Sequence, residues 1–96
     1  MLKFVPEKPG HITLKGELDF SMAEQFRKEL ATQRQSAKSF VFDFSEVTET
    51  DVCGMQVLVA FAREVKEVRL LNVNPDHAKM MRQTGIAGRL HVEEKN

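Results

Sequence analysis

The stretch that decides the fold is residues 39–65, which read SFVFDFSEVTETDVCGMQVLVAFAREV. Its apolar run, residues 40–44, is too short for a surface helix and predicts a central strand buried on both faces. We expect residues 45–51 to form a polar loop and residues 52–59 to begin an apolar helix. A strand, a loop and a helix N-terminus in this order leave backbone N–H groups without helical partners beside Asp51. Such a place suits a phosphate or the polar groups of a partner.

Length and composition indicate an ordinary globular protein. The 96 residues are 42% hydrophobic and 29% charged, so we expect a single domain over residues 1–96 with a frayed tail at 93–96. The 14 basic residues balance the 14 acidic ones, which argues against nucleic acid as a partner. No apolar stretch approaches the roughly 20 residues that cross a bilayer, and no signal peptide is recognisable. We therefore expect a cytoplasmic protein without direct membrane insertion.

The segments before residue 39 predict a hairpin and a helix. Residues 2–5 and 12–15 alternate with period two around a turn, which predicts an antiparallel pair that ends at Gly16. Ser21 followed by Glu24 has the form of a capping box, and an amphipathic helix follows to about residue 35.

The segments after the second helix alternate in the same way. Residues 68–73 predict a strand, and Asn74 followed by Pro75 predicts the start of a third helix that ends near Gly85. Residues 90–92 predict a short edge strand. The whole order predicts an α/β sandwich: a mixed β-sheet of four to five strands with three to four helices mainly on one face.

Four short motifs occur in a fixed order along nearly the whole chain. They are the GELD sequence at residues 16–19, FDFS at 42–45, a loop that closes with Asp51 and Gly54, and Asn74-Pro75 followed by TGI at 84–86. In this order and spacing they resemble the STAS domain, the fold of bacterial anti-sigma factor antagonists.

The resemblance implies a regulatory module that binds another protein. In phosphorylatable members of the family, a Ser or Thr follows the loop aspartate in a D-[ST]-x-G motif, and a serine kinase that is also the anti-sigma factor phosphorylates it. The unphosphorylated antagonist binds that kinase and releases the sigma factor. Here the acceptor position is Val52, which has no hydroxyl, so the resemblance implies binding to a serine kinase-like anti-sigma factor without the usual switch.

We expect the contact surface to combine the start of the second helix, the loop before it and the turn before the first helix. Its candidate partner-binding residues are Asp19, Phe20, Thr48, Thr50, Asp51, Val52, Cys53, Gly54 and Met55. Thr48 and Thr50 are alternative phosphoacceptors, although hydroxyls in such a loop more often cap a helix. Asp51 is expected to be the helix N-cap, and Gly54 to allow a close backbone approach.

Three further residues leave alternatives open. Asp19 either caps the first helix together with Ser21 or contributes an acidic rim to the contact surface. Asp43 is expected to bond loop backbone. Cys53 has no assigned role: a helix N-terminus favours the thiolate, but a lone cysteine in an apolar helix is usually a small buried side chain.

Enzyme chemistry has no support in the sequence. The three histidines lie on different predicted elements, and no metal-binding, nucleophile or nucleotide-cradling motif is present, so we expect no catalytic residue, metal or cofactor. An alternative to the antagonist role is an accessory STAS subunit of an ABC-type lipid transport complex, or a partner-binding module of another signalling complex. The oligomeric state does not follow from the sequence.

Overall fold

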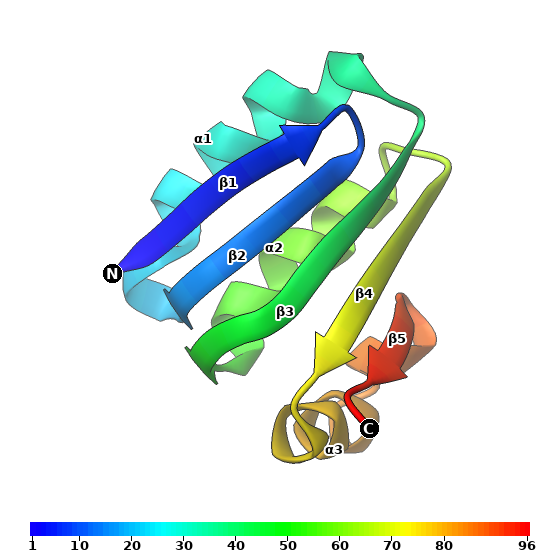
Figure 1. Ribbon diagram of the computed structural model, residues 1–96. Helices are drawn as coiled ribbons and strands as arrows, with labels where there is room; N and C mark the ends of the chain where they lie inside the picture. The colour runs from blue at the N-terminus through cyan, green and yellow to red at the C-terminus, as the bar shows by residue number, and fades with distance from the viewer.

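Five strands form one sheet in the order β1-β2-β3-β4-β5, and the computed structural model describes all of residues 1–96 (Figure 1). The strands are β1 (Leu2–Lys8), β2 (His11–Leu18), β3 (Ser39–Thr50), β4 (Glu67–Val73) and β5 (His91–Glu94). The helices are α1 (Ala23–Gln33), α2 (Val52–Ala62) and α3 (Pro75–Gln83), with 3-10 turns η1 (Phe20–Met22), η2 (Arg34–Ser36) and η3 (Ile86–Gly88). The expected α/β fold is confirmed.

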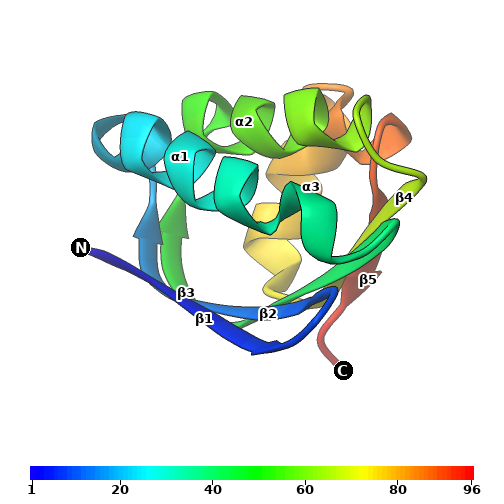
Figure 2. The ribbon, with the colours of Figure 1, turned by 90° about the horizontal axis from the view of Figure 1, so that it is seen from above.

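The sheet is mixed, and its helices cover one face. β1 and β2 form the expected antiparallel hairpin, whereas β2, β3, β4 and β5 are parallel neighbours. Figure 2 shows the three helices on the same side of the sheet, with the other side uncovered. None of the helices has the length and apolar character that crossing a membrane requires.

The central strand is buried on one face, and our expectation of burial on both faces is wrong. Phe40, Phe42 and Phe44 are buried, but Val41 and Asp43 are only half-buried. Successive side chains of a strand point to opposite faces, and no helix covers the face that receives Val41 and Asp43.

Aromatic side chains join the sheet to both of its first two helices. The ring of Phe42 meets Phe26 of α1 and Phe61 of α2 edge-on, with centroid separations of 6.4 Å and 6.2 Å. Phe61 also packs edge-on against Phe40 at 5.0 Å. Edge-to-face pairs are favoured by the ring quadrupoles, so this cluster fixes where α1 and α2 lie on the sheet.

β3 continues to Thr50, so the expected loop at residues 45–51 is mostly strand. The pairing of β3 with β4 ends where Asp43 lies opposite Leu71, but the pairing with β2 continues until Thr50 lies opposite Leu18. The polar residues predicted a loop wrongly, because this part of β3 is a strand that has a partner on one side only.

Gly16 lies inside β2, which ends at Leu18, so the expectation that Gly16 terminates the strand is also wrong. It pairs with Leu2 of β1 and Val47 of β3 and has a φ of +97°. A Cβ at this position would lie 2.2 Å from the carbonyl oxygen of Met1. The glycine therefore allows a local irregularity of the strand and does not end it.

The start of α1 differs from the predicted capping box. Asp19 caps the η1 turn: its Oδ1 accepts hydrogen bonds from the backbone N–H of Ser21 at 3.0 Å and from the Ser21 hydroxyl at 2.6 Å. Helix α1 begins only at Ala23, and Glu24 pairs with Arg27 on the helix surface. The η1 turn displaces the helix start, so Ser21 is not its N-cap.

The C-terminal elements follow the predicted order. Asn74 caps α3 by accepting a hydrogen bond from the Asp76 N–H at 2.8 Å, and Gly85 ends the helix region with a φ of +80°. β5 extends to Glu94, two residues into the segment 93–96 that we expected to fray. Glu94 accepts a hydrogen bond from Arg82 of α3 at 2.8 Å, which helps to hold the strand in place.

Asp43 binds backbone, as expected, at the point where β3 loses β4. Its Oδ1 accepts hydrogen bonds from the Ser45 N–H at 2.9 Å and from the Asn72 side-chain amide at 3.2 Å. Partial burial raises the pKa of Asp43, but the hydrogen bonds from Ser45 and Asn72 outweigh burial and bring the pKa below its ordinary value of 3.8.

We predict that Asp43 contributes to acid unfolding. Because its folded-state pKa is lowered, its carboxylate stabilises the fold at a pH above 3.8, and that contribution is lost as the pH falls through the folded-state pKa. Asp43→Asn should lower stability at neutral pH and flatten its decline in acid. Urea unfolding followed by circular dichroism measures both effects, because the chain has no Trp or Tyr. Glu49→Gln, at an exposed carboxylate, is the control, and an unchanged acid slope in Asp43→Asn would contradict the assignment.

Candidate functional site

Two segments that are distant in the sequence meet at the N-terminus of α2. One carboxylate joins them: Asp51 Oδ1 accepts a hydrogen bond from the Gly54 N–H at 2.7 Å, and its Oδ2 accepts one from the Phe20 N–H at 3.0 Å. Asp51 is therefore the expected helix N-cap and also a tether for the η1 turn. We call the residues around this junction, Asp19, Phe20, Asp51, Val52 and Cys53, the Phe20–Val52 surface.

Gly54 allows α2 to lie directly on the end of β2. A Cβ at Gly54 would lie 2.3 Å from the carbonyl oxygen of Leu18 and 3.2 Å from the backbone nitrogen of Asp19. No side chain fits at the shorter distance, so the expected close backbone approach is confirmed and its partner is a strand of the same chain. Gly54 itself is buried and is not available to a partner protein.

The Phe20–Val52 surface exposes apolar side chains. Phe20 is 74% exposed and Val52 is 38% exposed, and Met1 is the only other large apolar side chain that is mainly exposed to solvent. Asp51 connects the two residues: its Oδ2 accepts a hydrogen bond from the Phe20 N–H, and Val52 is the next residue in the chain. Exposed apolar groups that lie close together mark contact sites more often than isolated ones do.

The other predicted site residues divide into exposed and buried ones. Cys53 is exposed, which excludes the alternative of a small buried side chain and leaves its role unassigned. Met55 is fully buried in the core and cannot touch a partner. Thr48 is exposed on β3, whereas the hydroxyl oxygen of Thr50 is buried and has no hydrogen-bond partner. Neither threonine caps α2, because Asp51 does so.

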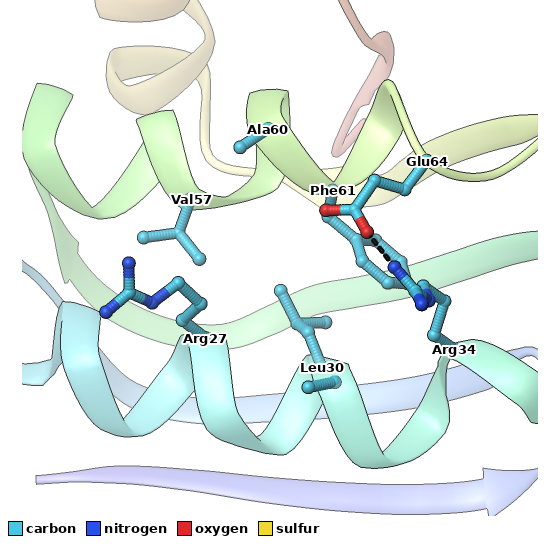
Figure 3. A pocket seen from close by; sticks show the side chains of 8 residues that line it. Arg27, Leu30, Arg34, Val57, Ala60, Phe61 and Glu64 are labelled. Atoms are coloured by element: carbon cyan, nitrogen blue, oxygen red, sulfur yellow. Dashed lines mark hydrogen bonds and ion pairs between the residues drawn. The ribbon is translucent and has the colours of Figure 1, made fainter.

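A groove that the sequence did not reveal lies between α1 and α2 (Figure 3). Its cavity of about 100 Å³ has an apolar lining, and Figure 3 shows Arg27 near one end and the Arg34–Glu64 ion pair near the other. The apolar residues that line it are Leu30, Ala31, Val57, Ala60 and Phe61. A second hollow shares Arg27 and Val57 and reaches Ala23 at the start of α1. The apolar stripes in the sequence predict both helices. The groove itself forms only because α1 and α2 pack side by side.

Comparison with known proteins identifies the family. The sequence description of the STAS domain matches residues 4–95, so the chain belongs to the STAS domain family. No curated protein matches the sequence.

Solved structures with a similar fold include regulators and a transporter-related protein. An anti-sigma factor antagonist from Mycobacterium paratuberculosis has a TM-score of 0.81 at 18% identity, covering 97% of this chain and 86% of that one. The unphosphorylated anti-sigma factor antagonist SpoIIAA, described in its phosphorylated form as a Bacillus cell fate determinant, has a TM-score of 0.70 at 19% identity, with coverages of 100% and 90%. A sulfate transporter family protein from Wolinella succinogenes has a TM-score of 0.74 at 20% identity, with coverages of 97% and 82%. At these identities the likeness shows the fold alone.

We predict that Gly54→Ala destabilises the protein by about 1–3 kcal/mol, because the added methyl group forces the first turn of α2 away from β2. The free energy of unfolding in urea measures this loss. Gly88→Ala is the matched control, since a Cβ there has no neighbour within 4 Å and no left-handed backbone to strain. Equal stability of the two variants would show that the close contact at Gly54 is unimportant.

Proposed function

We propose that this STAS domain is a non-enzymatic regulatory module that binds a serine kinase-like anti-sigma factor through the Phe20–Val52 surface. The observation that carries the proposal is the exposed pair Phe20 and Val52 beside the Asp51 tether. The resemblance to anti-sigma factor antagonists supports the kind of partner. We also propose that the module works in the cytoplasm.

The physical case for docking rests on an exposed aromatic side chain whose backbone is held by a hydrogen bond. Burying an exposed Phe contributes about 1.5–3 kcal/mol, and aromatic residues dominate the energetics of many interfaces. The backbone of Phe20 is already fixed by its hydrogen bond to Asp51, so less conformational entropy is lost when a partner covers it. Asp19 and Asp51 lie beside the apolar pair and would favour a partner with basic groups at the rim of its site.

The same surface lacks the usual phosphoacceptor. Val52 has no hydroxyl, so we propose that affinity is fixed where SpoIIAA has both a phosphorylated and an unphosphorylated form. A phosphate here would add about −2 charge beside the carboxylates of Asp51 and Asp19 and would oppose an apolar contact. Thr48, which is exposed, is the better of the two alternative acceptors, because a kinase cannot reach the buried hydroxyl oxygen of Thr50.

A second candidate is a constitutive subunit contact, as in an accessory STAS subunit of an ABC-type lipid transport complex. The hydroxyl-free position at Val52 favours it, since a permanent contact needs no switch. The fold also occurs in a sulfate transporter family protein, which supports a transporter-associated role for STAS domains in general. The two candidates differ in their partner: a soluble kinase-like protein in the first, a membrane transport complex in the second.

We predict that Val52→Asp weakens partner binding by at least about tenfold, because it places a charge in an apolar contact. The variant should fold normally, since an acidic residue in the first turn of a helix is favourable. Quantitative mass spectrometry of proteins captured by wild-type and variant baits from the native cell measures the loss and identifies the partner. Thr32→Asp adds the same charge at an exposed position of α1 and should leave partner capture unchanged, although it costs some stability at the end of the helix. A partner retained by Val52→Asp would move the interface elsewhere.

We also predict that incubation with the captured kinase and ATP adds no phosphate to the wild-type chain. Val52→Ser restores a D-[ST]-x-G motif and should gain one phosphate, which intact-mass spectrometry detects. The result would show that the missing hydroxyl alone abolishes the switch. A phosphopeptide that carries Thr48 from the wild-type chain would instead show regulation through β3.

A further inference from the structure

A polar hollow of about 320 Å³ lies between α2 and the segment that follows α3. Its walls come from one side of α2 and from the turn between α3 and β5. The residues that line it are Gln56, Val59, Arg63, Thr84, Gly85, Ile86 and Arg89. It shares no residue with the groove between α1 and α2 or with the Phe20–Val52 surface, so the docking proposal does not account for it.

The hollow gathers positive charge without any compensating acid. Four arginines of the chain form ion pairs with glutamates: Arg27, Arg34, Arg69 and Arg82. The two remaining arginines, Arg63 and Arg89, form none, and both line this hollow, which contains no Asp or Glu. Arginine stays charged at every physiological pH, so two cations with unused donors face one solvent-filled space.

The helix dipole explains the place of one of these two arginines but not of the other. Arg63 follows the last turn of α2, where a cation is favoured by the helix dipole. That argument does not apply to Arg89, which follows the short η3 turn. Nor does it explain why both arginines without a glutamate partner line the same hollow, while the other four are each paired with a glutamate.

The other residues that line the hollow also suit the binding of an anion. Val59 and Ile86 are buried and give the hollow an apolar floor, which strengthens electrostatic attraction above it. The side-chain amide of Gln56 makes no hydrogen bond within the chain and adds a free donor. Gly85 has a φ of +80°, and a Cβ there would meet nothing within 4 Å, so the wall at this point is open to a ligand.

We propose that this hollow is a binding site for a small ligand with a phosphate group, held by Arg63 and Arg89. Guanidinium groups bind phosphate oxygens in pairs of parallel hydrogen bonds, and two of them balance the two charges of the group. A volume near 300 Å³ is at the lower end for small-molecule sites, so the ligand is free phosphate or a small phosphate ester. The site is independent of protein docking, and either can exist without the other.

The test is an NMR titration of the ¹⁵N-labelled chain with inorganic phosphate at constant ionic strength. We expect saturable shifts confined to the amides of residues 56–63 and 84–89. Arg63→Gln and Arg89→Gln should each weaken binding about tenfold or more, because each removes hydrogen bonds from a charged donor. Arg27→Gln removes an equal charge outside the hollow and should leave binding unchanged. Unchanged melting temperatures would show that all three variants fold.

Two further ligands separate the possible sources of the phosphate group. Tighter binding of glycerol 3-phosphate than of inorganic phosphate would identify a phosphate ester as the ligand, and the reverse would identify free phosphate. Succinate that binds as tightly as either would overturn the assignment to phosphate. Shifts that do not saturate, or that persist in Arg63→Gln and Arg89→Gln, would overturn the site itself.

Discussion

The backbone contact between Gly54 and Leu18 is the constraint on which the rest of the candidate docking surface depends. Because no side chain separates them, α2 begins directly against the end of β2. The chain leaving β2 must then turn away through η1, which carries Phe20 outward to the start of α2. The Phe cluster around Phe42 holds the same helix to the sheet farther along its length. The place of the Phe20–Val52 surface therefore depends on the close contact between the backbones of Gly54 and Leu18.

Asp51 holds the start of α2 and the η1 turn together. Its two carboxylate oxygens serve two different segments, one the helix it caps and the other the turn before α1. A single side chain therefore combines a local role, which any N-cap has, with a long-range one. Both hydrogen bonds restrain the backbone next to Val52, and backbone order before binding reduces the entropy lost when a partner docks.

The charges of the molecule are divided unevenly although the total is zero. Carboxylates gather beside Phe20 and Val52, whereas the two unpaired arginines lie in the hollow between α2 and the segment after α3. The two proposed sites therefore differ in charge: the proposed docking surface has carboxylates at its rim, and the proposed phosphate site has two arginines. Net charge alone, which argues against nucleic acid, does not reveal either place.

Sequence alone determined the order of the elements and the N-caps Asp51 and Asn74, because periodicity and capping are local; that Gly54 is needed for the contact with Leu18 of β2 became visible only in the fold. It misjudged the polar end of β3 and the place of Gly16 within β2, since strand pairing there depends on a neighbour. Only the tertiary structure decided that Cys53 is exposed, that Met55 is buried, that the Phe20 backbone bonds to Asp51, and that Arg63 and Arg89 share a hollow. The rotation of a helix on its sheet sets which side chains face solvent, and that rotation depends on contacts between segments far apart in the chain.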